Sequence, residues 1–111
     1  MQEYEVILTW ESIYDITDIA DYIEAEFGEK RADLFQDDIK KQIDDLAIMG
    51  NVFGKTQIFY RHYCIHKKLF LPSIIFYIVK EAEKEVHVLR VLREESNWEK
   101  TLTGQQEYTY P

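Results

Sequence analysis

Apolar residues recur at two different spacings along the chain, and the change of spacing separates a helical part from a sheet. From Ile13 to Phe27, and again from Ala32 to Leu46, apolar residues recur every three or four positions with acidic residues between them. This period places the apolar side chains on one side of a helix. Residues 60–93 instead hold short runs rich in β-branched and aromatic residues, which favour strands. The pattern therefore predicts two amphipathic helices followed by a sheet.

Polar residues and glycines mark the ends of the two predicted helices. Thr9 or Ser12 can cap the first helix, because a side-chain oxygen there accepts a hydrogen bond from a free amide of the first turn. Gly28 can end that helix, since it tolerates a left-handed backbone, and Gly50 closes the second. Two amphipathic helices joined by so short a turn form an antiparallel hairpin. The apolar stripes of this hairpin must be buried, and the sheet is the surface available.

The remaining segments complete an α+β domain. Strands are expected at 4–8, 60–68, 74–79 and 85–93, with a connector of no regular pattern at 51–57, a turn around Pro72 and a hairpin loop at 81–84. A short closing helix, with Trp98 and Leu102 packed down, is expected within 94–102. The predicted fold is β-α-α-β-β-β, with the helical hairpin on one face of a mostly antiparallel sheet. It forms a single domain of residues 1–102, and residues 103–111 are expected to be a frayed tail.

Size and composition indicate a single domain outside the membrane, in a reducing compartment. At 111 residues the chain is one domain with a core of its own. No apolar run approaches the roughly 18 residues that a membrane span needs, and the first residues do not resemble a signal peptide. The one cysteine, Cys64, fits a reducing compartment. A cytoplasmic protein without a membrane partner is expected.

Charge is distributed unevenly, although the formal net charge is −8. Residues 1–49 hold 14 acidic and 4 basic residues, whereas residues 50–93 hold 8 basic and 3 acidic residues. One interpretation is a basic working surface beside an acidic scaffold. The other is that the two helices simply have solvated acidic faces.

Three residues in the second half suggest metal or nucleophile chemistry, and strand geometry argues against both. His62, Cys64 and His66 would share one face of a strand. The two histidines would then lie about 13 Å apart, too far to share one metal ion. Cys64 and His66 would lie about 6.6 Å apart, beyond hydrogen-bond reach for an activated nucleophile. No metal ion and no cofactor are expected.

The remaining candidates for chemistry are cations on or beside the predicted sheet: Arg61, Lys67, Lys68, Arg90 and Arg93. Arg90 lies within an apolar strand, where an unpaired guanidinium is costly. It either forms an internal ion pair with an acid of the helices or faces a surface that binds a phosphate or carboxylate. Lys67 and Lys68 have the simpler explanation of surface solubility, and Trp98 that of a core residue.

The order of elements, together with two sequence runs, resembles the RelE/ParE toxin superfamily of type II toxin–antitoxin (plasmid stabilisation) modules. The runs are Ile75-Phe76-Tyr77 and the segment from Val86 to Trp98. The most specific piece is Leu89-Arg90-Val91-Leu92, which is similar to the ParE signature at the end of the last strand. The resemblance extends over nearly the whole chain, from about residue 4 to 102. It implies a bacterial growth-inhibiting toxin that a cognate antitoxin holds inactive.

The resemblance leaves three functions open. ParE-like members inhibit DNA gyrase, and the last strand favours this function. RelE-like members are metal-independent endoribonucleases that cut mRNA in the ribosome, which requires a general base and cations for the phosphate. For that activity Arg61, Lys67, Lys68, Arg90 and Arg93 would bind phosphate, and the candidate catalytic residues are His66, His87 and Tyr77. The third function is that of a non-toxic interaction module, and a homodimer is a further candidate assembly.

Overall fold

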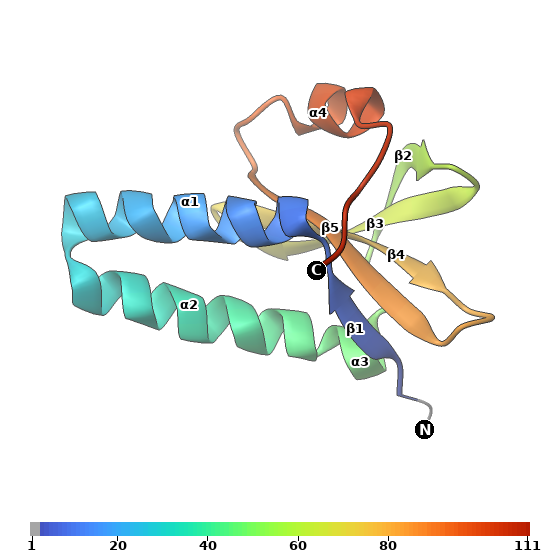
Figure 1. Ribbon diagram of the computed structural model, residues 1–111, viewed down its shortest axis with the longest axis horizontal. Coiled ribbons are helices and arrows are strands. Elements are labelled where there is room, and N and C mark those ends of the chain that lie inside the picture. The colour runs from blue at the N-terminus through green and yellow to red at the C-terminus, as the bar shows by residue number, and fades with distance from the viewer. Residues whose placement is uncertain (1–2) are drawn as a thin grey trace.

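A five-stranded sheet runs through the protein, with a long helical hairpin on one face and a short helix on the other (Figure 1). The structure is a computed structural model, and it describes residues 3–111; residues 1 and 2 of the predicted domain lie outside the described part. Among residues 3–111, no helix is long and apolar enough to cross a membrane. The elements are β1 (Glu5–Leu8), α1 (Trp10–Phe27), α2 (Glu29–Asp44), α3 (Leu46–Met49), β2 (Lys55–Tyr60), β3 (Tyr63–Phe70), β4 (Ser73–Lys80), β5 (Glu85–Arg93) and α4 (Trp98–Gly104).

The sheet has the strand order β1-β5-β4-β3-β2. β1 pairs in parallel with β5, and the remaining pairs are antiparallel. The predicted α+β class and the helical hairpin on a mostly antiparallel sheet are thus confirmed. β4 lies at the centre, and the first six of its residues are buried in succession. Such a run is expected for a strand covered on both faces.

The ends of the hairpin helices follow the local signals in the sequence. Thr9 caps α1, because its hydroxyl oxygen accepts a hydrogen bond from the Ser12 amide at 3.1 Å. The same hydroxyl donates to the Val88 carbonyl at 2.9 Å, which fixes the start of α1 on β5. Gly28, with φ of 98°, separates the two helices, and only glycine adopts that conformation without strain.

Alternation along the strands produces two cores. The first face of the sheet, which includes Ile75, Tyr77 and Val88, packs against the helical hairpin. The second face, which includes Ile65, Phe76 and Leu89, packs against α4 and the C-terminal residues. A β-bulge in β5 leaves Leu89 as an extra residue between the partners of Phe76 and Tyr77.

One expected strand proved to be parts of two. Residues 60–68 were predicted to form a continuous strand, but β2 ends at Tyr60 and Arg61 turns the chain with φ of 57°. Residues 51–57 were expected to be an irregular connector, but residues 55–57 form the first half of β2. The sequence hides β2 because its inward position is a threonine: the Thr56 hydroxyl donates to the Ile65 carbonyl at 2.8 Å. The turn holds neither glycine nor proline, so nothing in it signals a strand end.

The C-terminal region is more ordered than its sequence suggests. The predicted closing helix is present as α4, with Leu102 buried and the Trp98 ring 5.0 Å from that of Phe76. Residues 103–111 were expected to be a frayed tail, and the first two of them belong to α4. Residues 105–111 have no regular secondary structure, yet Tyr108 is only 7% exposed and its ring contacts Tyr60. These contacts join residues far apart in the sequence, and no local pattern reports them.

Candidate functional site

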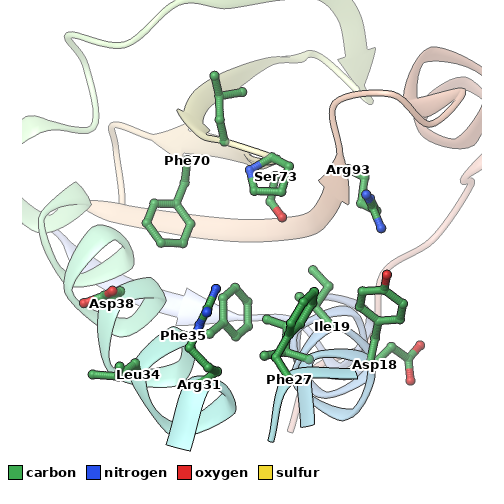
Figure 2. A pocket seen from close by; sticks show the side chains of 14 residues that line it. Asp18, Ile19, Phe27, Arg31, Leu34, Phe35, Asp38, Phe70, Ser73 and Arg93 are labelled. Carbon is green, nitrogen blue, oxygen red and sulfur yellow. The ribbon is translucent and has the colours of Figure 1, made fainter. Parts of the chain in front are cut away.

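An apolar groove opens between the far end of the helical hairpin and the turn that joins β3 to β4 (Figure 2). It has a volume of about 710 Å³. Figure 2 shows Phe27, Leu34 and Phe35 of the two helices on one side, opposite Phe70 and Ser73 on the other.

The groove exists because the hairpin is longer than the sheet beneath it. α1 has 18 residues and is therefore about 27 Å long. Its last turns and the first turns of α2 extend past the edge of the sheet (Figure 1). Ile23 and Phe27, two apolar residues at this end of α1, line the groove.

Large apolar side chains in the groove remain exposed to solvent. Phe27 is 57% exposed, Leu34 53% and Leu71 61%. A contiguous apolar patch of this kind usually marks a site for another molecule, because its burial is favourable by about 25 cal/mol per Å².

Charged residues lie at the rim of the groove. The Arg31 guanidinium lies 5.3 Å from the Phe27 ring, and that of Arg93 lies 5.9 Å from the Tyr22 ring. Arg93 also pairs with Glu95, but both side chains are exposed, and such pairs contribute little. Both guanidinium groups are therefore available to a carboxylate of a bound segment.

Arg90 has the internal role that the sequence left open. Its guanidinium binds the Asp15 carboxylate through two hydrogen bonds of 2.7 and 2.9 Å and donates a third to Gln105 at 3.2 Å. Asp15 also accepts the Val91 amide at 3.0 Å. The pairing of β1 with β5 ends at Val88, so β1 does not reach the Val91 amide and the Asp15 side chain bonds it instead. The arginine of the signature is thus a link between α1, β5 and the C-terminal residues.

Lys68 is likewise committed to the fold. Its ammonium is buried, donates to the Gln42 carbonyl near the end of α2 at 2.8 Å, and lies 4.8 Å from the Phe53 ring. Burial lowers the pKa of Lys68, and the charge of Asp45 opposes this shift.

None of the three candidate catalytic side chains is presented to solvent as a free base. Tyr77 is 0% exposed, donates to the Gly50 carbonyl at 2.6 Å, and has a pKa raised by burial. His66 is buried against Tyr77, and burial lowers its pKa although the Phe53 carbonyl opposes this. His87 is buried between Glu85 and Tyr110, with contacts of 2.9 and 2.6 Å.

Arg61 and Lys67 each lie over a ring that packs on the second face. The Arg61 guanidinium is 5.2 Å from the Tyr60 ring, and the Lys67 ammonium is 5.5 Å from the Trp98 ring. The structure therefore does not bring the five predicted cations together in one site. In the part of the chain that it describes, no three His, Cys, Asp or Glu side chains are placed to hold a metal ion.

The sequence interpretation missed the groove itself. Its one visible signal is Leu34, an apolar residue outside the buried stripe of α2 formed by Ala32, Phe35, Ile39 and Ile43. An off-stripe leucine alone is common on protein surfaces. Only the overhang of the hairpin makes it part of a groove.

Comparison with known proteins agrees with this architecture. The family model described as "ParE toxin of type II toxin-antitoxin system, parDE" matches residues 6–98. A chromosomal ParDE toxin–antitoxin system from P. aeruginosa matches with a TM-score of 0.69 and 21% identity, over 84% of this chain and 98% of that one. The RelBE2 toxin–antitoxin complex from Mycobacterium tuberculosis matches with a TM-score of 0.56 and 16% identity, over 86% and 97%. A search of curated proteins found no match.

Proposed function

Since the chain belongs to the ParE toxin family of type II toxin–antitoxin systems, we propose that a cognate antitoxin inactivates it by binding in the groove at the end of the helical hairpin. We further propose that the free toxin stops growth by inhibiting DNA gyrase, without catalysis of its own. The open groove is the observation that carries the first part.

The groove specifies the chemistry of the antitoxin segment. Its walls favour an amphipathic segment that inserts apolar side chains between Phe27, Leu34 and Leu71. Arg31 and Arg93 at the rim favour an acidic residue on that segment, because an arginine binds a carboxylate through two hydrogen bonds. The structural relatives, a ParDE toxin–antitoxin system and a RelBE2 toxin–antitoxin complex, support an antitoxin as the partner.

The state of the candidate bases supports gyrase rather than RNA as the target. Cleavage of RNA needs a base within about 3 Å of the 2′-hydroxyl. His66, His87 and Tyr77 are all buried and hydrogen-bonded within the fold. A toxin that binds its target without cleaving RNA requires none of them.

Growth assays with and without the antitoxin test the groove. The toxin gene is induced alone and together with the neighbouring antitoxin gene. The variants Leu34→Asp and Leu71→Asp should stay toxic but escape rescue, because a carboxylate in the groove opposes burial. Val52→Asp is the matched control, since Val52 is 67% exposed and does not line the groove. If the antitoxin rescues the groove variants as fully as the control, the groove is not its binding site.

Two assays, one with purified gyrase and one on RNA from the induced strain, distinguish inhibition of gyrase from cleavage of messenger RNA. Supercoiling by purified gyrase should fall as the toxin is added and recover when the antitoxin follows. Messenger RNA ends mapped after induction should stay unchanged. New ends within translated reading frames, with supercoiling unaffected, would instead identify the ribosome-dependent endoribonuclease.

A further inference from the structure

The C-terminal strap, residues 105–111, lies outside the part of this chain that matches the family model. The family match ends at residue 98, before the strap begins. The strap has no regular secondary structure. In Figure 1 it descends from α4 past the start of α1 and ends near β1.

The middle of the strap is held by α1 and β2. The Tyr108 ring packs edge-on against the Tyr60 ring, with 4.8 Å between centroids. Thr109 donates through its amide and its hydroxyl to the Glu11 carboxylate, both at 2.9 Å, and its carbonyl accepts the Trp10 amide at 2.8 Å. These contacts are few, and apart from the ring they lie at the surface.

The two ends of the strap are held by β5. Gln105 accepts a hydrogen bond from Arg90. The Tyr110 hydroxyl lies 2.6 Å from Nδ1 of His87, whose Nε2 faces Glu85. The strap therefore covers the part of the second face that lies between β2 and β5.

The main anchor of the strap has a defect. The Tyr108 hydroxyl is buried and finds no hydrogen-bond partner among residues 3–111. An unsatisfied buried hydroxyl has lost its hydration without replacement, so the closed position carries a penalty that an open one does not. The strap is thus attached by a ring whose polar end favours release.

The second face has a chemistry of its own around and beneath the strap. Three cations there each lie over a ring that packs on this face: Arg61 over Tyr60, Lys67 over Trp98, and Lys80 over Tyr63 at 5.4 Å. In the described residues none of the three cations forms an ion pair with a carboxylate. Lys55 adds a further cation beside Lys67 and Trp98 in a shallow depression that one acidic residue, Glu99, also lines.

Cations interleaved with rings match one class of ligand. Bases stack on aromatic rings, and phosphates pair with lysine and arginine, so single-stranded nucleic acid uses both components. An acidic peptide would use only the cations. The Tyr108 ring packs on the Tyr60 ring, one of the three rings, and would therefore compete with a base for stacking there.

We propose that the strap is a displaceable cover, and that its release exposes a second face that binds single-stranded nucleic acid. The groove at the hairpin lies elsewhere on the protein, so this proposal is independent of the antitoxin site and of the gyrase target. The proposal concerns binding, and it assigns no cleavage to this face.

Two substitutions at one strap residue test the cover. In the full-length protein, Tyr108→Ala removes the anchor, whereas Tyr108→Phe removes only the unpartnered hydroxyl. The probe is a fluorescent uridine RNA of about twelve nucleotides, followed by anisotropy at low salt. Tyr108→Ala should bind about tenfold tighter than the wild type, and Tyr108→Phe should bind more weakly than the wild type.

Charge variants show whether the gain comes from the exposed face. In the Tyr108→Ala background, Arg61→Gln, Lys67→Gln and Lys80→Gln should each reduce the gain and its dependence on salt. Lys30→Gln is the matched control, because Lys30 is exposed at the start of α2 on the hairpin. Equal loss in the control would show that net charge alone governs binding and would overturn the proposal.

A separate pair of substitutions covers the case in which Tyr108→Ala fails to fold. Glu11→Gln with Tyr110→Phe weakens both surface attachments of the strap without leaving a cavity. Faster exchange of the Trp10 amide would report the release, and tighter RNA binding should accompany it. Release without a gain in RNA binding would refute the proposal, and equal binding of a polyglutamate peptide would refute the choice of nucleic acid.

Discussion

The two faces of the sheet are closed in different ways. On the first face the helical hairpin covers the strands but overhangs them, and its far end leaves an apolar groove with exposed Phe27 and Leu34. On the second face α4 and the strap cover the strands, and the uncovered groups are cations over rings. The first face thus keeps an exposed apolar end, while much of the second face is covered by α4 and the strap.

The difference shows how one scaffold can separate two kinds of recognition. The acidic hairpin presents apolar surface with two arginines at its rim, which suits an amphipathic segment. Among the basic residues of the second half, Arg61, Lys67 and Lys80 lie over rings of the second face. Lys68 and Arg93 instead contact the side of the hairpin, so the uneven charge of the sequence corresponds only in part to a difference between faces. Of the two interpretations of that charge, the basic-surface one still requires a binding test.

Breaking the ion pair that links the two faces, Asp15 with Arg90, should strongly lower the stability of the fold. Asp15 and Arg90 are mostly buried and join α1, β5 and the strap. Asp15→Ala leaves the Arg90 guanidinium without its carboxylate and should lower the free energy of unfolding by about 3 kcal/mol, measured by urea denaturation. The matched control is Asp44→Ala, which breaks an exposed pair with Lys40 and should cost less than about 0.5 kcal/mol. Equal losses in the two variants would mean that the link does not join the faces.

Two buried tyrosines allow the same chemical change on each face. Tyr77→Phe on the first face removes a hydroxyl that bonds the Gly50 carbonyl, and should destabilise by about 1 to 2 kcal/mol. Tyr108→Phe on the second face removes a hydroxyl without a partner and should be neutral or stabilising by up to about 1 kcal/mol. Thermal unfolding of the two variants gives the comparison directly. The same sign for both would show that the Tyr108 hydroxyl does find a partner.

Acid should weaken the first face through His66. Burial lowers the pKa of His66 in the folded protein, so between its folded and unfolded pKa values the unfolded chain binds more protons. The stability contributed by the neutral ring is complete above about pH 6.5 and is lost as the pH falls through the folded pKa. In unfolding curves between pH 8 and 5, His66→Gln should flatten part of this slope. His62→Gln, at an exposed position in the β2–β3 turn, is the control substitution.

The sequence predicted what depends on neighbouring residues and missed what depends on distant ones. The hairpin followed from Thr9, Gly28 and two apolar stripes, because caps and periodicity are local. β2 escaped because Thr56 faces inward in place of an apolar residue. The strap escaped because Tyr108 meets Tyr60 across the fold.

The candidate site was harder to predict than the fold for the same reason. Arg90 is polar in an apolar strand, and its sequence position alone does not reveal whether an acid such as Asp15 lies within reach. His66, His87 and Tyr77 are reactive residue types, but burial decides what they can do. The groove depends on the length of the hairpin relative to the sheet, which is a property of the assembled fold.

The smallest expected effect on stability is the one that most sharpens the contrast. Leu34 lines the groove and is 53% exposed, so Leu34→Asp removes little buried apolar area and should change the free energy of unfolding by less than about 0.5 kcal/mol. Ile39, five residues further along α2, is buried against the sheet, and Ile39→Asp should unfold the protein because it buries a charge. Denaturation curves for both variants measure the difference. Loss of antitoxin rescue at unchanged stability would show that Leu34 serves the antitoxin site and not the fold. A large loss of stability in Leu34→Asp would instead mean that the hairpin end belongs to the core.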